Sequence, residues 1–315
     1  MLPQPCISLE NKIKNEASRL GFSNCGIARM ESLENLRPWY SQYLQEKRHL
    51  PFQYLERYAE KRLNPALLLE ETRSVIALLI NYYPPELIPH EDNFILSKYA
   101  YGKDYPSPIR KKMENLIHFM QAESPALKAK AFVDSGPVLE KLWAQRSGIG
   151  WQGKHSLIIN QHGGSFFFIG IILTNLELEA DPPETDHCGN CDRCIRACPT
   201  GALERPYQLN IPRCIANLTI EQKSEIPAAF KGKMQDRIYG CDICQDVCPY
   251  NRFSEPHEEP EFMPSAILKQ MRKKDWLALT EEQFKILFTG SPVARLGYQR
   301  LMSNIRFCHD PENNG

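Results

Sequence analysis

The sequence lacks an excess of charge of either sign, a long apolar run and any internal repeat. Its 38 lysines and arginines balance 38 aspartates and glutamates, so overall charge gives no sign of a nucleic-acid partner, and a local patch would have to supply any phosphate contacts. No apolar run reaches the roughly 18–20 positions that a membrane-spanning helix needs. Residues 1–10 contain neither an apolar signal core nor paired arginines. We therefore expect a cytoplasmic protein without membrane contact.

Cysteine, by contrast, is frequent and unevenly distributed. Eight of the 11 cysteines lie between Cys188 and Cys248, whereas Cys6, Cys25 and Cys308 are scattered. A reducing compartment disfavours disulfides, so this concentration points to metal binding. The 315 residues, 42% of them hydrophobic, allow a substantial core and about two domains.

The first cysteine run has the spacing of bacterial ferredoxins. Its pattern is C-x2-C-x2-C-x3-C-P, formed by Cys188, Cys191, Cys194, Cys198 and Pro199. Three thiolates separated by two residues each can bind one [4Fe–4S] cube within a single turn. The fourth is followed by a helix-breaking proline and points toward a second cube.

The second run has the same ending but lacks the first cysteine. Cys241, Cys244 and Cys248 precede Pro249, and Cys214 lies alone between the runs. We therefore predict crossed ligands, with cluster I held by Cys188, Cys191, Cys194 and Cys248, and cluster II by Cys198, Cys214, Cys241 and Cys244. Structural zinc and disulfides are the alternatives. Interleaving through C-x3-C-P ends favours iron–sulfur clusters.

Upstream of the cysteines, the pattern predicts strands and helices of a mixed domain. Residues 74–81 (SVIALLIN) predict a buried strand, and residues 128–133 predict a second strand that ends at Asp134. Asp134 or Ser135 would cap the next helix, with Pro137 in its first turn. Asp134 thus has two interpretations: an N-cap carboxylate, which the sequence alone favours, or a general acid at the end of a strand.

Residues 157–173, which follow a lead-in segment at 151–156, predict a β-hairpin. Residues 157–160 form its first strand, 162–164 (HGG) its turn and 165–173 its second, strongly hydrophobic strand. His155 precedes the first strand. A histidine alone in such a place more often makes a structural hydrogen bond than it binds a metal.

Beyond the cysteines, residues 255–264 predict an acidic linker, and helical segments follow. Thr280 and Gln283 form the capping box of one helix. The tail is locally basic, which indicates either a solvated helical surface or a phosphate-contacting face. We divide the chain into an α/β domain (1–180), a double-cluster domain (181–255) and a helical C-terminal segment (256–315).

Several segments together closely resemble the epoxyqueuosine reductase family. The resemblance is carried by residues 132–140 (FVDSGPVLE) and 150–160 (GWQGKHSLIIN), followed by the cluster motifs, and extends to residues 54–65 and 99–105. It implies a nitroreductase-like α/β or α+β domain, similar to the cobalamin domain of reductive dehalogenases, with a ferredoxin-like module and a short HEAT-like tail. It also implies a monomeric oxidoreductase that uses cobalamin and two [4Fe–4S] clusters. Such an enzyme takes electrons from a flavodoxin or ferredoxin and reduces epoxyqueuosine to queuosine at the wobble position of tRNA.

By the same resemblance, Asp134 matches the family's proton donor, which reverses the N-cap interpretation. The positions expected to line the corrin pocket are Arg57, Ser97, Asp134, Ile158, Ile169 and Ala216. The positions expected to contact tRNA are Lys141, Asn160, Lys223 and Lys231. We expect a basic patch that runs from Lys98 and Lys103 past Lys141 to Lys233.

Some features depart from the family's pattern. Pro106 stands where many relatives have histidine after Asp104 and Tyr105, and Ser97 occupies a position that other residues can fill, so no side-chain cobalt ligand is implied. The tail is also shorter than the helical repeats of many relatives. Two other classes stay open: a ferredoxin-like electron carrier without a substrate, and a reductive dehalogenase-like cobalamin enzyme.

Overall fold

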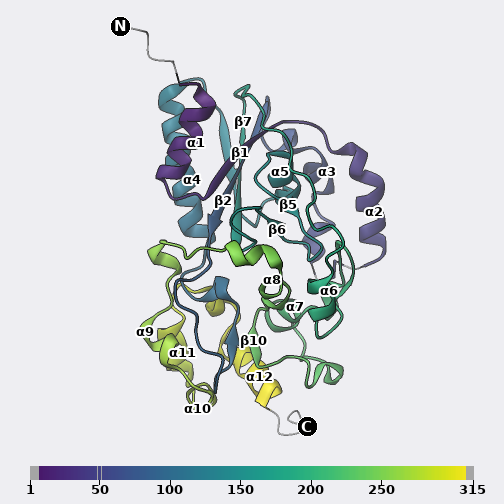
Figure 1. Cartoon of the computed structure of the whole chain (residues 1–315), viewed down its shortest axis with the longest axis vertical. Coiled ribbons are helices and arrows are strands. Elements are labelled where there is room, and N and C mark those ends of the chain that lie inside the picture. Colours follow the sequence, from purple (N-terminus) through teal and green to yellow (C-terminus); the bar gives the residue numbers. More distant parts are fainter. Residues whose placement is uncertain (1–6, 48, 51, 310–315) are drawn as a thin grey trace.

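A four-stranded antiparallel sheet with helices on both faces organises the first half of the chain (Figure 1). The computed structural model describes residues 7–47, 49–50 and 52–309. The sheet has the order β1–β2–β7–β4, with strands β1 (Asn24–Arg29), β2 (Ser74–Asn81), β7 (Phe167–Thr174) and β4 (Ala129–Phe132). All its pairings are antiparallel. The expected mixed fold is therefore confirmed in its α+β form.

Strand β2 is buried on both faces, as its apolar run predicts. Ile76, Leu78 and Ile80 pack into one core beside α1 (Leu9–Arg19) and α4 (Pro106–Glu123). Val75, Ala77 and Leu79 pack into the opposite core, with α2 (Arg37–Gln45), α3 (Ala59–Leu63) and α5 (Glu140–Arg146). Successive side chains of a strand point to opposite faces, so one continuous apolar run can support both layers.

Helix α5 begins later than the sequence suggested. The prediction that Asp134 or Ser135 caps it is wrong, because α5 starts at Glu140 and its N-cap residue is Leu139. Pro137 disfavours helical backbone at Gly136, and the non-helical segment continues to Leu139. Asp134 lies instead in the loop after β4, with a left-handed φ of 60°.

The predicted hairpin over residues 157–173 is also wrong. Strand β6 (Ile158–Ile159) pairs with β5 (Trp151–Gln152), whereas β7 pairs with β2 and β4. Only an isolated bridge between Asn160 and Gly164 links the two parts. Strand β7 is apolar on both faces and contributes side chains to both cores, so burial places it at the centre of the sheet.

The cysteine-rich part is built from short elements that loop back on each other. They are α6 (Arg193–Ala197), β8 (Leu203–Arg205), β9 (Gln208–Leu209), α7 (Ile215–Ile220), β10 (Arg237–Tyr239) and α8 (Ile243–Asp246). Helices α6 and α8 contact each other. A small core forms beside the cysteines from Ile215, Leu218, Ile226, Met234 and Ile243.

The tail consists of α9 (Ala266–Gln270), α10 (Lys273–Leu277), α11 (Glu281–Leu287) and α12 (Tyr298–His309). The predicted capping box of Thr280 and Gln283 is confirmed at the start of α11. The tail does not stand apart from the rest. Its core includes Ile88, Phe94 and Tyr101 from the first half, and β10 pairs in parallel with β3 (Ile95–Leu96).

The predicted linker over residues 255–264 contains no strand or α-helix, and part of it is packed. Phe262 is buried, and the backbone N–H of Lys103 donates to the carbonyl of Glu261 at 2.7 Å. The division at residues 180 and 255 stays a prediction, and the structure ties all three parts together. Among the described residues, no helix is both long and apolar enough to cross a bilayer.

Candidate functional site

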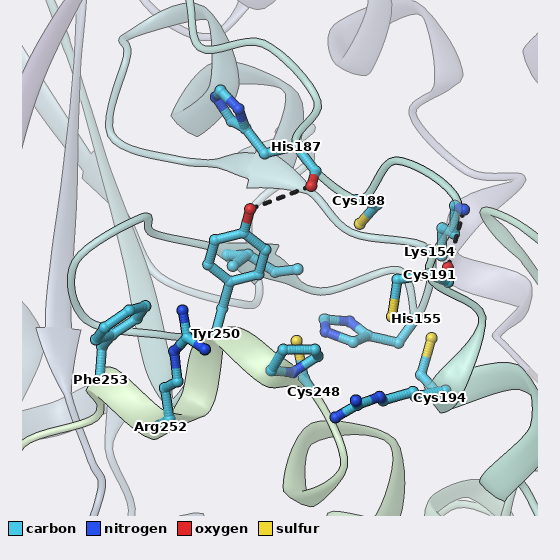
Figure 2. Close-up of a pocket in the computed structure, with 13 residues that line it drawn as sticks. Lys154, His155, His187, Cys188, Cys191, Cys194, Cys248, Tyr250, Arg252 and Phe253 are labelled. Atoms are coloured by element: carbon cyan, nitrogen blue, oxygen red, sulfur yellow. Dashed lines mark hydrogen bonds between the residues drawn. The ribbon is translucent and has the colours of Figure 1, made fainter.

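Four thiols from both cysteine runs surround one cavity of about 290 Å³. Cys188, Cys191 and Cys194 come from the first run, and Cys248 comes from the end of the second (Figure 2). The structure thus brings together the four cysteines assigned to cluster I. Burial, and then the charges of Cys248 and Cys188, raise the pKa of Cys194 to about 11. Four thiolates so close together need a cationic centre between them to ionise.

The other four cysteines form a second, deeper group. Burial, and then the charges of Cys241 and Cys214, raise the pKa of Cys244 well above its usual range. Burial raises the pKa of Cys214, with a further increase from Cys198. The two groups adjoin, because the charge of Cys194 also raises the pKa of Cys244. This placement of the thiols is compatible with the crossed ligand assignment, which stays a prediction.

The surroundings of the thiols suit iron–sulfur clusters. Cys198 Sγ accepts a hydrogen bond of 3.2 Å from the backbone N–H of Ala202. Lys154 Nζ fastens the first run by donating to the carbonyls of Gly189 and Cys191, at 2.5 and 2.9 Å. All ten described cysteines are free, and Cys6 lies outside the described residues. No three His, Cys, Asp or Glu side chains in the described part could hold a single metal ion, whereas in a cube each thiolate binds its own iron.

Asp134 lies exposed on its loop and is surrounded by groups from distant parts of the chain. The charge of its carboxylate raises the pKa of Tyr105, which precedes α4, and the pKa of Glu221, which follows α7. Burial raises the pKa of Glu221 against the opposing effect of Arg295, and Asp134 raises it further. Arg295, from the tail, forms an ion pair with Asp104 at 3.1 Å. Asp134 therefore faces a polar rim to which the sheet domain, the cysteine-rich part and the tail all contribute.

Tyr105 is a proton-bearing neighbour of Asp134. Its ring stacks on Phe168 of β7, with 4.0 Å between centroids and 10° between planes. Burial, and then the Asp134 charge, raise the pKa of Tyr105 far above its usual range. The phenol thus stays protonated and can donate toward a carboxylate or a nearby oxygen.

Glu140 is the second carboxyl of the site. Its Oε1 accepts a hydrogen bond of 2.7 Å from the backbone N–H of Asp134. Burial, and then the Asp134 charge, raise the pKa of Glu140 to about 8. Because the charge of one carboxyl raises the pKa of the other, one of the two can hold a proton near neutrality.

Arg62 provides the test of whether a large oxygen-rich cofactor fits here. Its side chain is buried, with 5% exposure, and its Nε has no hydrogen-bond partner among the described residues. Its contacts with the carbonyls of Gly136 and Tyr54 are long, at 3.5 and 3.4 Å. A buried guanidinium with unmet donors favours a ligand that brings oxygens. The amide and phosphate oxygens of cobalamin fit that requirement, next to the Asp134 loop.

The residues expected to line the corrin pocket differ in how available they are. Arg57 is exposed, and Ile169 and Ala216 are partly exposed. Ile158 is buried in β6. Ser97 is not available as a free hydroxyl, because it is buried and its Oγ is hydrogen-bonded to Asp242. It joins the β3 segment to the cluster II segment instead.

Of the four residues expected to contact tRNA, two have side chains that are hydrogen-bonded within the protein and two are exposed. Lys141 Nζ donates to the carbonyl of Ser156 at 2.6 Å, and burial lowers the pKa of Lys141. The side chain of Asn160 is buried and makes three hydrogen bonds, to Ile149, His162 and Gly163. Asn160 is therefore closed off from a phosphate, whereas Lys141 is partly exposed and stays a candidate contact. Lys223 and Lys231 are exposed.

The expected basic patch is correspondingly shorter than predicted. Lys98 is buried, and its ammonium lies 2.6 Å from Asp246 and 3.5 Å from Asp242. Lys103 is exposed but paired with Glu261 at 2.9 Å. Lys98 is therefore not part of a surface patch, because it compensates buried carboxylates of the cysteine-rich part, whereas Lys103 stays at the surface with its charge paired.

Sequence reasoning missed several groups of this site. Tyr105 and Glu140 received no role from it, although Glu140 lies in the segment FVDSGPVLE that carried the resemblance. Arg62 was interpreted as part of a solvated helix face rather than an anion site, and Arg295 only as part of the basic tail. For Glu140, the six-residue spacing from Asp134 was the available signal. Arg295 lies 161 positions after Asp134, and no local pattern could have linked the two.

Two family models match the chain. The 4Fe-4S double cluster binding domain matches residues 187–251, which contain all eight cysteines of the two groups. The family described as Epoxyqueuosine reductase QueG, DUF1730, matches residues 62–135, which end just past Asp134.

Whole-chain relatives agree with these models. The epoxyqueuosine reductase of Cellulophaga algicola is 47% identical over 295 residues, covering 94% of this chain and 96% of the relative. That of Escherichia coli is 37% identical and covers 94% of this chain and 79% of the relative. A crystal structure of epoxyqueuosine reductase with an epoxyqueuosine-modified tRNA-Tyr stem loop has a TM-score of 0.87 at 30% identity, covering 97% of this chain and 83% of that one. The chain therefore belongs to the epoxyqueuosine reductase family.

Proposed function

We propose that this chain reduces epoxyqueuosine to queuosine in the anticodon loop of tRNA, the last step of queuosine biosynthesis. The observation that carries the proposal is one juxtaposition. Two adjoining groups of four thiols, able to hold electron-carrying clusters, lie in the same structure as Asp134 and its rim of protonated groups. A solved relative was crystallised with an epoxyqueuosine-modified stem loop, and we extend that substrate to this chain.

The reaction needs both electrons and protons. Removing the epoxide oxygen breaks two carbon–oxygen bonds, forms a carbon–carbon double bond and releases water, so it consumes two electrons and two protons. When bound, the two clusters supply single electrons and cobalamin supplies a strongly reducing cobalt centre. Cys188, Cys191, Cys194 and Cys248 would hold one cluster, the other four cysteines the second, and Arg62 with the corrin-lining residues the cobalamin.

Residues of the chain itself bind and transfer the proton that the leaving oxygen needs. Asp134 is exposed to an incoming oxygen and held by its backbone to Glu140. Tyr105 keeps its proton beside it, because burial and the Asp134 charge raise its pKa. We assign to Asp134 the transfer of a proton to the leaving oxygen, a role typically worth about 10²–10⁴ in rate. Glu140 and Tyr105 hold that carboxyl in place and maintain its supply of protons.

The substrate base must leave its stack to reach this site. Enzymes that act on a base extrude it from the strand, and anticodon loops offer unpaired bases that proteins recognise by stacking and edge contacts. The exposed lysines Lys223, Lys231 and Lys233 are candidates for phosphate contacts. We further propose a cytoplasmic, monomeric enzyme that takes electrons from a flavodoxin- or ferredoxin-type donor.

Mass spectrometry of tRNA nucleosides tests the proposal directly. Anaerobic protein loaded with iron, sulfide and cobalamin is incubated with reductant and tRNA that carries epoxyqueuosine. We expect queuosine to appear only when cobalamin is present. Reducible clusters without queuosine would instead indicate a ferredoxin-like carrier, and dehalogenation of a halogenated phenol without queuosine would indicate a dehalogenase.

A further inference from the structure

The hydrogen bonds of His155 fix where its proton lies. The ring is buried, with 4% exposure. Its Nδ1 accepts a hydrogen bond of 3.2 Å from the backbone N–H of Leu157. Because Nδ1 uses its lone pair as an acceptor, the neutral ring must carry its hydrogen on Nε2.

That Nε2–H has nothing within the chain to bond. No hydrogen-bond partner for His155 Nε2 exists among the described residues. The ring lines the cluster I cavity, and in Figure 2 it lies among Cys191, Cys194 and Cys248. A buried donor without an acceptor is costly, so the donor needs a partner that occupies this cavity.

The backbone around His155 is shaped to hold the ring against the cavity. A Cβ on Gly153 would lie 2.4 Å from Ile159 Cδ1 and 3.1 Å from His155 Cε1, so a larger residue would clash with Ile159 and crowd the ring. Gly153 and Leu157 close the turn with a backbone hydrogen bond of 2.8 Å. Lys154, between them, binds the carbonyls of Gly189 and Cys191. The turn that carries the histidine is thereby attached to the loop that carries the cluster I cysteines.

We propose that His155 Nε2–H donates a hydrogen bond to a sulfur of cluster I and raises the reduction potential of that cluster. The inference rests on the proposed function, because it requires the cluster. The physical reason is charge: the reduced cluster is more negative than the oxidised one, so a donor to its sulfur stabilises the reduced form more. Cluster I would then accept an electron more readily than its thiolates alone allow.

Trp151 gives the same wall a second donor. Its side chain is fully buried, and its indole Nε1 has no nitrogen or oxygen partner among the described residues. It faces Cys188. Burial raises the pKa of the Cys188 thiol, and the hydrogen bond from Trp151 lowers it. Both donors come from residues 151–155, which also lie within the segment GWQGKHSLIIN.

His187 lines the same cavity and serves as the matched control. Its Nε2 lies 3.0 Å from Glu184 Oε1 and 3.3 Å from Thr185 Oγ1, so it already has partners. A second histidine at the same cavity, with its Nε2 satisfied, separates a specific hydrogen bond from the general effect of losing an imidazole.

The test is a redox titration followed by electron paramagnetic resonance on cluster-loaded, anaerobic protein. We expect His155→Leu to shift the midpoint potential of cluster I to more negative values and to leave cluster II unchanged. His155→Gln, which retains an N–H at similar reach, should restore much of the potential, and His187→Leu should leave both potentials unchanged. An unchanged cluster I potential in His155→Leu, or an equal shift in His187→Leu, would overturn the inference.

A second readout covers the case in which His155→Leu fails to take up iron. Wild-type protein labelled with ¹⁵N-histidine should show a nitrogen hyperfine coupling to reduced cluster I, and His155→Gln should lack it. Absence of that coupling in the wild type overturns the inference. Nucleoside turnover is measured in parallel. A potential shift in protein that makes no queuosine would reject the proposed function alone, and turnover without a shift would reject this inference alone.

Discussion

The backbone N–H of Asp134 donates to Oε1 of Glu140 across 2.7 Å. Asp134 adopts a φ of 60°, a conformation that costs an ordinary residue about 1–2 kcal/mol. Glu140 is the first residue of α5, so the helix holds the loop in this conformation through one side chain. Glu140, which positions the candidate acid, therefore itself carries a carboxyl group, and the charge of Asp134 raises the pKa of that group.

Glu140 should make the protein less stable as the pH rises. Burial and the Asp134 charge raise its folded pKa to about 8, from an ordinary 4.5. The folded state therefore binds more protons than the unfolded state between those values, so the free energy of unfolding falls as the pH increases through this window. Glu140→Gln keeps the oxygen that accepts from Asp134 and removes the titration. We expect its melting temperature to change less than that of wild type over roughly pH 5–9, a range that covers most of the interval between the two pKa values.

Differential scanning fluorimetry of the cluster-loaded protein across this pH range measures the effect. Glu114→Gln, on the exposed side of α4, is the control and should follow the wild-type curve. A Glu140→Gln curve that parallels the wild type would mean that Glu140 ionises normally in the folded state.

Asp134→Asn should remove activity without unfolding the protein. The amide is nearly isosteric, and the hydrogen bond to Glu140 uses the backbone of residue 134, so the loop should keep its conformation. The amide supplies no acidic proton, so turnover of epoxyqueuosine tRNA should fall by about 10²–10⁴. Ser135→Ala, at the exposed neighbouring position, is the control. Cobalamin-loaded Asp134→Asn with wild-type turnover would show that the proton comes from another group.

Cys198→Ala should damage cluster II although it belongs to the first cysteine run. Its sulfur lies with Cys214, whereas Cys248 lines the cluster I cavity. Iron content should fall from about eight to about four per chain, with the cluster I signal retained. Cys308→Ala removes a cysteine outside both groups and should keep the full iron content. Loss of the cluster I signal with cluster II intact would contradict the crossed assignment.

Lys98 should matter more for stability than Lys103. Lys98 is buried between Asp246 and Asp242, and removing one partner of a buried pair leaves uncompensated charge, at a cost of about 3–5 kcal/mol. The Lys103 pair with Glu261 is exposed, and such pairs contribute about 0–1 kcal/mol. Thermal unfolding of holo Lys98→Ala and Lys103→Ala should therefore give a clearly lower midpoint for the first only. Equal midpoints would mean that the carboxylates near Lys98 find solvent or another cation.

Local patterns predicted this chain well where the determining residues are close in sequence. The apolar run 74–81 gave a strand buried on both faces, and Thr280 with Gln283 gave a capping box. The cysteine spacing implied a crossing of ligands, which stays a prediction, and Cys248 does line the same cavity as the first three cysteines. In each case the physical cause lies within a few residues, or within a motif whose geometry is set by its spacing.

The errors have a common cause in long-range packing. Residues 157–173 look like a hairpin, but the burial of both faces of β7 draws it between β2 and β4. Lys98 reads as a surface charge, yet Asp242 and Asp246, more than 140 positions away, hold it inside. Such partners are set by how distant segments meet, and one sequence carries no signal of that.

Lys231 and Lys233 should contribute to tRNA binding more than to chemistry. Lys98 and Asn160 are buried, and Lys141 Nζ is bonded to the carbonyl of Ser156, so the exposed lysines of residues 223–233 are the better candidates for phosphate contacts. Each phosphate contact releases counterions, so the logarithm of affinity should fall with the logarithm of salt by about 0.7–0.9 per contact. Reversing both charges should therefore raise the KM for tRNA, flatten its salt dependence and change kcat little.

Steady-state kinetics of Lys231→Glu/Lys233→Glu at several salt concentrations measure this effect. Arg110→Glu/Lys111→Glu reverses two exposed charges on α4 and is the matched control, which should keep the wild-type KM and salt slope. Cobalamin and iron contents must equal those of wild type, so that a change in KM reports RNA binding alone. The free epoxyqueuosine nucleoside provides the last comparison: because it lacks the phosphates, the double variant should process it as wild type does. If wild type reduces the nucleoside as efficiently as the tRNA, these lysines have no phosphates to hold, and the patch has some other role.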